Sequence, residues 1–322
     1  DANQFGQVLV SWNTDEAARG EIYHGTPAPN LALTNRTLDL SQNMALANLA
    51  ANQVVKYYVV AQDEAGNRAT NGNGGVFFSV TNTQPPTVLL VDSYADYADL
   101  GVTTPPLSGY TDALDALGTS YDTFDARTNP PPTLSQLQPY RCVIWRVDEI
   151  APPDPALVQT IARYVTNGGS LFVASMEAHT RFAEGGVTSF FAKTLQVQTV
   201  TENQLVIDVA GSPGEPVGSG LHATLDYSPY DELLVLLGFL GITDPSDWIT
   251  PTTNAVPILL AEGQIVGVRA PKTGVDLPGR VVFLSFPLDA VPVGTGIGNN
   301  RASLLQNILN FLAPAPNSSS IT

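Results

Sequence analysis

The segment from Asp154 to Ala174, DPALVQTIARYVTNGGSLFVA, predicts a helix followed by a buried strand. Asp154 supplies an N-cap, Pro155 suits the first turn, and the pair Gly168-Gly169 ends the helix. The residues that follow, from Ser170 to Ala174, form an apolar run without polar alternation. Such a strand is covered on both faces, which is typical of the parallel sheet of an α/β domain.

The same succession of strands and helices continues on both sides of this segment. Strands are predicted at 88–92, 121–125 and 142–145, and a helix at 111–117. A last helix at 300–312 presents one apolar face, made of Leu304, Leu305, Ile308, Leu309 and Leu312. Less regular β segments lie at 195–200, 205–209, 258–260, 265–269 and 281–286. Together these elements predict a flavodoxin-like or amidotransferase-like α/β domain with a mainly parallel sheet over residues 87–313.

The periodicity of residues 7–80 is different. Short alternating runs, including Val8–Trp12, Gly20–Tyr23 and Val55–Ala61, are separated by turn residues, which predicts an antiparallel immunoglobulin-like sandwich. A hairpin turn is expected at 63–67, where Gly66 or Asn67 can take positive φ. The proline-bearing segment 83–86 predicts a linker, so we expect a multidomain chain with an all-β domain at 1–82.

The first block resembles a fibronectin type III-like domain, in the form found in bacterial secreted proteins and before purple acid phosphatase domains. The resemblance rests on three segments: Val10–Glu16, Glu21–Thr26 and Tyr57–Asn67. In that family the module is usually a spacer or adhesive unit. The family's first strand normally precedes the Val10-Ser11-Trp12 strand, and we expect it to be missing here.

The second block resembles the class I glutamine amidotransferase-like fold, in its degenerate versions from secreted bacterial proteins. Four segments carry the resemblance: Val88–Asp92, Tyr110–Leu114, Asn167–Val173 and Val281–Pro287. These are fold-level motifs, and they do not transfer an activity.

The resemblance implies where a catalytic nucleophile would lie. Active members of that fold carry a cysteine on a sharp turn after a strand, and the matching position here is Ser175. The family's second catalytic region contains a histidine, whereas this chain has Phe286-Pro287-Leu288-Asp289. Ser175 with His179 remains as a candidate serine hydrolase pair, although Glu177 replaces the usual glycine of the turn. The simpler interpretation is that Ser175 ends a strand and the domain is not catalytic.

Asp92, Asp96 and Asp99 follow the first predicted parallel strand, where loops often form a site. They are candidate calcium ligands, because calcium binds carboxylate oxygens, and a solvated acidic loop is the alternative. No other cofactor is predicted. Tyrosines near the strand ends, Tyr94, Tyr97, Tyr227 and Tyr230, are candidates for stacking on a glycan if they are exposed.

Composition limits the partners. The chain has 30 acidic and 14 basic residues, with a formal net charge of −16, which disfavours nucleic acid. Cys142 is the only cysteine, which excludes an internal disulfide and favours a buried core position. No apolar run is long enough for membrane insertion. The Asn-, Thr- and Ser-rich polar surface suits an extracellular or cell-surface protein.

The ends of the chain suggest an assembly. The segment 314–322 has the composition of a linker followed by the opening strand of a sandwich domain. If one copy donates this strand to the next, the chain forms a head-to-tail homopolymer. The alternative is that the chain neighbours similar domains in a longer protein. We therefore expect a non-catalytic extracellular structural or adhesive protein; the alternative is a secreted hydrolase, or its accessory domain, acting on peptide or polysaccharide.

Overall fold

The computed structural model describes residues 8–47, 49, 53–81, 87–239, 246–272, 279–294 and 300–314. The chain divides into two compact units, Asp1–Pro85 and Pro86–Thr322, and it is rich in strands that form mixed sheets, with fewer helices. The expected linker and, apart from Pro314, the expected donor tail lie outside the described residues. Among the helices of the described residues, none is long and apolar enough to cross a membrane.

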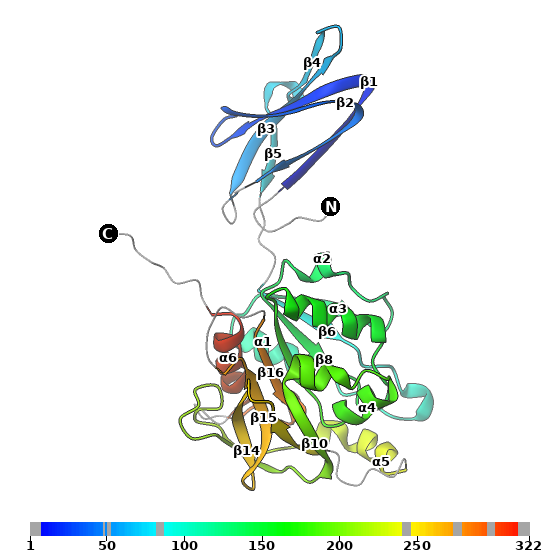
Figure 1. Ribbon diagram of the computed structural model, residues 1–322, viewed down its shortest axis with the longest axis vertical. Helices are drawn as coiled ribbons and strands as arrows, with labels where there is room; N and C mark the ends of the chain where they lie inside the picture. The colour runs from blue at the N-terminus through cyan, green and yellow to red at the C-terminus, as the bar shows by residue number, and fades with distance from the viewer. Residues whose placement is uncertain are drawn as a thin grey trace, which may run out of the picture. The chain divides into compact units, whose positions relative to one another are not determined.

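The described part of unit 1 is built from strands (Figure 1). They form one connected sheet in the order β2-β1-β3-β4, with β5 paired to β3. The prediction of separate strands at Val8–Trp12 and Gly20–Tyr23 is wrong, because the chain passes from one to the other through a bulge between Asn13 and Ala18. Because β1 runs through both parts of unit 1, all five strands belong to one bent sheet, whereas a sandwich of two separate sheets was expected. The strands are β1 (Val8–Gly25), β2 (Leu31–Leu46), β3 (Val54–Asp63), β4 (Arg68–Asn71) and β5 (Phe78–Thr81).

The core of unit 1 lies between the two halves of the long strands. The first half of β1 pairs with the end of β2, and its second half pairs with both β2 and β3. Val10, Ile22 and Val59 meet in this core, so apolar side chains from both halves of the bent sheet are buried together. The predicted hairpin is confirmed: Gly66 has φ 95° and its N–H donates to the carbonyl of Asp63.

Unit 2 contains a nine-stranded sheet in the order β12-β11-β14-β15-β16-β9-β8-β6-β7. The pairs from β16 to β7 are parallel and those from β12 to β16 are antiparallel, so the prediction of a mainly parallel sheet is wrong. The strands are β6 (Val88–Asp92), β7 (Tyr121–Asp125), β8 (Cys142–Arg146), β9 (Ser170–Ala174), β11 (Asp208–Gly211), β12 (His222–Thr224), β14 (Val256–Ala261), β15 (Gln264–Ala270) and β16 (Val281–Leu284).

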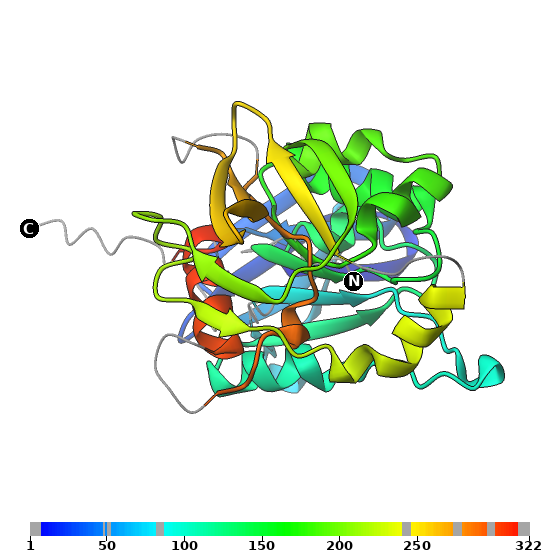
Figure 2. The same ribbon diagram turned by 90° about the horizontal axis from the view of Figure 1, so that it is seen from below.

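Helices cover both faces of this sheet (Figure 2). Val88 and Leu90 face the side of α1 and α6, whereas Leu89 and Val91 face the side of α3 and α4. Because β6 is covered on both faces, it is apolar without alternation, as the sequence predicted. The helices are α1 (Ser108–Ala116), α2 (Leu134–Leu137), α3 (Pro155–Thr166), α4 (Ala178–Glu184), α5 (Asp231–Phe239) and α6 (Arg301–Leu312).

Two predicted helices are confirmed in detail. Asp154 caps α3 by accepting a hydrogen bond from the N–H of Ala156 at 2.7 Å, with Pro155 in the first turn. In α6 the five predicted leucine and isoleucine side chains are buried, and Asn300 is the N-cap. Cys142 is buried in the core, as predicted, and burial raises the pKa of its thiol.

A separate two-stranded ribbon completes unit 2. Strands β10 (Val197–Gln204) and β13 (Ser246–Pro251) pair with each other in antiparallel register, with Thr201 opposite Trp248. The ribbon contacts α4 and β15.

Candidate functional site

The candidate site lies at the carboxyl edge of the parallel strands, where α/β sheets usually bind ligands. Strands β6 and β8 end at Asp92 and Arg146, and β9 is followed directly by Ser175. Polar and charged side chains are buried at this edge to an unusual degree. The buried residues of this kind are Asp92, Arg146, Asp148, Glu149, Ser175, Glu177, Arg181, Asp247 and Asp289.

Arg146 occupies the middle of this edge and is only 2% exposed. Its Nη1 lies 3.1 Å from Oδ1 of Asp92, and its Nη2 donates to the carbonyl of Pro105. The guanidinium lies 4.1 Å from the centre of the Tyr94 ring, a cation–π contact, while Tyr110 is farther away at 5.9 Å. Pairing with a carboxylate and an aromatic face makes this buried cation tolerable.

Asp289 faces the same region from the turn after β16. The hydroxyl of Tyr230 donates to its Oδ1, and burial raises the pKa of its carboxyl group. Its Oδ2 has no hydrogen-bond partner among the described residues, and the same holds for the Tyr94 hydroxyl and for Nε of Arg146. Asp289 packs directly on Gly109 of α1: a Cβ at residue 109 would lie 2.6 Å from Oδ2, so the glycine makes room for this carboxyl group.

Ser175, the predicted nucleophile, is 1% exposed and its hydroxyl donates to Oε2 of Glu149 at 2.7 Å. The backbone N–H groups of Met176 and Glu177 donate to the same carboxyl group at 3.3 and 2.8 Å. Residue 175 is not among the positions with positive φ, so the strained turn that exposes a nucleophile is not formed. Glu149 thus occupies these three donors, so they are not free to bind the carbonyl oxygen of a ligand.

His179, the predicted partner of Ser175, is directed elsewhere. Its Nδ1 lies 2.6 Å from Oε1 of Glu202 on β10, and its ring packs edge-on against Phe191 at 5.1 Å. Since Ser175 is bonded to Glu149, the two candidate catalytic side chains are engaged with different carboxyl groups. The structure does not bring them together as a pair.

Three buried carboxyl groups at this edge hold their protons unusually tightly. Burial is the main cause in each case: it raises the pKa of Glu149 to about 8, of Glu177 to about 7 and of Asp247 to about 9. Neighbouring acids add to the effect, since Glu177 and Glu202 raise the pKa of Asp247 further. Such shifts are typical of functional sites, although structural clusters of acids produce them too.

The three predicted calcium ligands are not gathered. Asp92 is buried against Arg146, whereas Asp96 and Asp99 are exposed, and Oδ1 of Asp96 accepts from the N–H of Ala98 in its own loop. Nowhere in the described part of the chain do three histidine, cysteine or acidic side chains form a group able to hold a metal ion. Asp92 pairs with Arg146 instead of joining Asp96 and Asp99, because the buried guanidinium of Arg146 needs a carboxylate partner.

The tyrosines expected to stack on a glycan are also placed differently. Tyr94 and Tyr230 are each 1% exposed, and Tyr97 is buried with its hydroxyl bonded to Asp148 at 2.7 Å. Tyr227 is partly buried, and its hydroxyl donates to the carbonyl of Val206 at 2.9 Å. These rings form a core beneath α5, because the helix brings Leu233 and Leu237 onto them.

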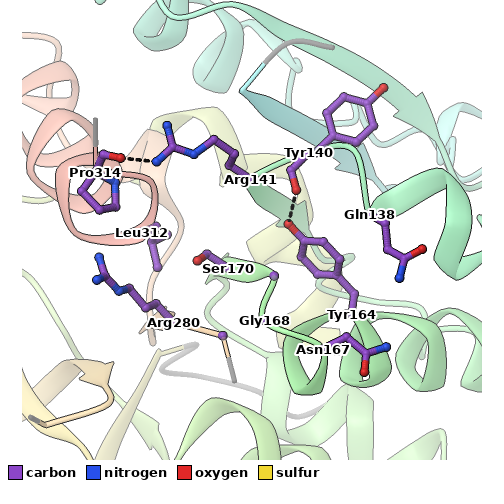
Figure 3. Close-up of a pocket in the computed structure, with 12 residues that line it drawn as sticks. Gln138, Tyr140, Arg141, Tyr164, Asn167, Gly168, Ser170, Arg280, Leu312 and Pro314 are labelled. Carbon is purple, nitrogen blue, oxygen red and sulfur yellow. Dashed lines mark hydrogen bonds between the residues drawn. The ribbon is translucent and has the colours of Figure 1, made fainter. Parts of the chain in front are cut away.

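A pocket of about 370 Å³ lies at the opposite, amino-terminal edge of the strands (Figure 3). Two arginines line it. Arg280 donates to the carbonyl of Phe311, in the last turn of α6, and Arg141 donates to the carbonyl of Pro314, just beyond the end of that helix. The hydroxyl of Tyr164 donates to the carbonyl of Tyr140 at 2.9 Å on the other side (Figure 3). The two arginines satisfy carbonyls at a helix C-terminus, which is a structural role.

The sequence interpretation missed Arg146 and Asp247 as members of the site, and it named Asp289 only as part of the segment that stands in place of the family's second catalytic region. Glu149 was considered, together with Asp148, only as a less favoured carboxylate candidate, although it lies three residues after the end of the buried strand β8. Asp247 offered no such signal, because it comes from a ribbon whose position depends on contacts far along the chain.

A scan against models of known protein families finds no match, and no curated protein matches the sequence. Among solved structures, a cytoplasmic protein from Salmonella typhimurium matches 70% of this chain and 98% of its own length, with 14% identity and a TM-score of 0.46. A ThuA-like protein from Bacteroides uniformis matches 73% of this chain and 95% of its own length, with 13% identity and a TM-score of 0.43.

An exo-β-1,4-mannosidase from Opitutaceae bacterium strain TAV5 matches 70% of this chain with 13% identity and a TM-score of 0.41. The match spans 34% of the mannosidase, so this chain corresponds to about a third of that enzyme's length. The function of the chain is therefore argued from its own residues.

Proposed function

We propose that this chain is a non-catalytic extracellular structural or adhesive protein, in which a fibronectin type III-like unit 1 is joined to a degenerate amidotransferase-like unit 2. The carrying observation is that the carboxyl group of Glu149 accepts hydrogen bonds from the Ser175 hydroxyl and from two backbone N–H groups. A substrate carbonyl would have to displace this buried carboxyl group. Because Glu149 occupies the hydrogen-bond donors at the end of β9, the site has no free donors there for a substrate, which supports a role for unit 2 as a scaffold.

Self-assembly is the second part of the proposal. Within the described residues, the segment 8–13 of β1 pairs with β2 along one edge only, and its pairing with β3 begins at Ala18. A strand with a free edge can accept a further strand, and the residues Val8, Leu9 and Val10 have high β propensity. The donor in this proposal is the segment 314–322 of a second copy.

Light scattering after size exclusion tests the assembly directly. The full chain is compared with a chain ending at Pro314. Assemblies larger than a dimer that disappear on truncation support a head-to-tail polymer. A monomer in both samples overturns self-assembly and leaves an adhesive or spacer role within a longer protein.

The second candidate is a secreted hydrolase, or its accessory domain, acting on peptide or polysaccharide. One observation favours it: the Ser175 hydroxyl lies 2.7 Å from a carboxyl group whose pKa is raised to about 8, which is the arrangement of a hydroxyl and a base. Turnover of ester, peptide or polysaccharide substrates that is lost in Ser175→Ala, with unchanged thermal stability, would establish it. Equal turnover in both proteins excludes Ser175 as the nucleophile.

A further inference from the structure

The pocket at the amino-terminal edge of the strands is lined by two arginines from different parts of the chain (Figure 3). Arg141 directly precedes β8 and Arg280 directly precedes β16. Strand β9 lies between β8 and β16 and pairs with both, so the backbones of the two arginines are two strand spacings apart, about 10 Å. Both side chains contact the end of α6, through the carbonyls of Pro314 and Phe311. The two guanidinium groups are therefore gathered on one side of a single pocket.

The contacts with α6 use only part of the hydrogen-bonding capacity of these arginines. A guanidinium group has five N–H donors, and among the described residues each of the two groups donates to a single carbonyl. None of the ion pairs found in the described part of the chain includes Arg141 or Arg280. The described residues that line the pocket include no acid, although the chain has 30 acidic residues. Most of these N–H donors are thus available to a ligand.

Two helix ends offset part of the positive charge. Both α3 and α6 end at the pocket, with Asn167 and Leu312 among its lining residues. A helix C-terminus carries about half of a negative charge, so the two ends together offset about one of the two positive charges. The remaining charge of about +1 matches a monovalent carboxylate better than a phosphate dianion. The net charge of −16 acts in the same direction, because it repels a dianion more strongly than a monoanion.

The neutral part of the lining fits a ligand with hydroxyl groups. Gln138 and Asn167 are exposed at the pocket, and their amide groups both donate and accept hydrogen bonds, as hydroxyls do. The wall beneath them is closely packed, because a Cβ at Gly169 would lie 2.2 Å from the ring of Tyr164. The hydroxyl of Tyr164 donates to the carbonyl of Tyr140 at 2.9 Å, which fixes that ring. The volume of about 370 Å³ is larger than a bare carboxylate needs and lies within the range of small-molecule sites.

We propose that this pocket binds a small carboxylic acid that carries hydroxyl groups, the chemistry of a uronic acid. Arg141 and Arg280 donate hydrogen bonds to the carboxylate, while Gln138 and Asn167 bond to the hydroxyls. The pocket lies at the edge of the sheet opposite Ser175, so the inference goes beyond the proposed function. Its failure would leave that proposal unaffected.

Isothermal titration calorimetry of the full-length chain with glucuronate tests this site. Glucose is the matched ligand without a carboxylate, acetate is a carboxylate without hydroxyls, and inorganic phosphate is the competing oxyanion. The first variants are Arg141→Gln and Arg280→Gln. Their control is Arg163→Gln, which removes the same charge from an exposed position of α3 outside the pocket.

A further variant leaves both arginines in place. Gln138→Glu adds a negative charge at an exposed residue of the pocket and keeps the contacts of the arginines with α6. It therefore tests the site even if an arginine variant does not fold. Gln159→Glu, at an exposed position of α3 that does not line the pocket, is its control.

Glucuronate is expected to bind at least about tenfold more tightly than glucose, acetate or phosphate. Each arginine variant should weaken glucuronate binding about tenfold to a hundredfold through the loss of charge-assisted hydrogen bonds. Gln138→Glu should weaken it about threefold by charge repulsion, while the two control variants bind like the wild-type chain. Absence of glucuronate binding, equal affinity for glucose, acetate or phosphate, or unchanged binding in the arginine variants and Gln138→Glu would each overturn the proposal.

Discussion

The hydroxyl of Ser175, the residue predicted from the sequence as a candidate nucleophile, donates to Oε2 of Glu149 at 2.7 Å. The same carboxyl group accepts from the N–H groups of residues 176 and 177. One side chain thus satisfies three buried donors and closes the end of β9. The stability of unit 2 should consequently depend on Glu149 more than on surface acids of the same region.

Glu149→Ala is expected to lower the free energy of unfolding of unit 2 by about 2–4 kcal/mol at pH 6, because it leaves the Ser175 hydroxyl and two backbone N–H groups without an acceptor. Urea unfolding followed by circular dichroism measures the loss. Glu184→Ala, which removes an exposed acid from the neighbouring helix, is the control and is expected to cost less than about 1 kcal/mol. Equal stability of the two variants would mean that the three donors find other partners.

The buried pair of Arg146 and Asp92 gives a second prediction. Arg146→Met is expected to destabilise unit 2 by about 3–5 kcal/mol, because Asp92 is left as a buried charge without a cation and Tyr94 loses its cation–π contact. Adding Asp92→Asn should recover part of the loss, since a neutral amide needs no counter-charge. A double-mutant cycle from thermal or urea unfolding provides the measurement, and purely additive effects would contradict coupling of the pair.

The third prediction concerns the global stability of unit 2 as a function of pH. Glu149, Glu177 and Asp247 have pKa values raised by burial to about 8, 7 and 9, so the folded state binds protons that the unfolded state releases above about pH 4. Their contribution is complete in acid and is lost as the pH rises through these folded values. The free energy of unfolding should fall by up to about 1.4 kcal/mol per pH unit for each proton.

Urea unfolding at pH 5, 6, 7, 8 and 9 measures this slope, and Asp247→Asn should make it shallower. Acids of unit 2 whose pKa is lowered in the folded state, such as Asp226 through its hydrogen bonds with Ser228, act oppositely and lose their contribution only at low pH. Stability that rises between pH 6 and pH 9 would contradict the predicted sign.

The fourth prediction concerns the cap of α3. Asp154→Ala is expected to cost about 1 kcal/mol, because the N–H of Ala156 loses its acceptor, whereas Asp154→Ser should retain most of the stability. The midpoint of thermal unfolding compares the two variants. A helix that tolerates alanine as well as serine at this position would show that packing of Leu157 and Ile161 alone fixes its start.

The elements that the sequence predicted well are those fixed by neighbouring residues. Asp154, Pro155 and the glycine pair at 168–169 act within one or two turns, so α3 begins and ends close to the predicted residues. Elements between β9 and β14 were predicted less accurately: the strands β10 and β11 are shifted from the expected segments, and α4 and α5 were not predicted. Their periodicity is weak, and packing rather than local preference decides their conformation.

The candidate site shows the same division. Ser175 could be placed at the end of a strand from the apolar run before it, and it lies there. Its pairing with Glu149 rather than His179 could not be predicted, because Glu149 and Ser175 are 26 residues apart and are brought together only when β8 and β9 pair in register.

The sequence by itself determined the α/β character of the segment from β6 to β9, the burial of Cys142 and the apolar face of α6, because periodicity and capping act over a few residues. Only the tertiary structure decided that β1 is continuous, that half of the large sheet is antiparallel, and that Glu149, Glu177 and Asp247 are buried. Strand pairing and the gathering of charges depend on contacts between distant residues. The free energies of these contacts depend on the removal of water from apolar and charged groups, and water is removed only when the chain folds.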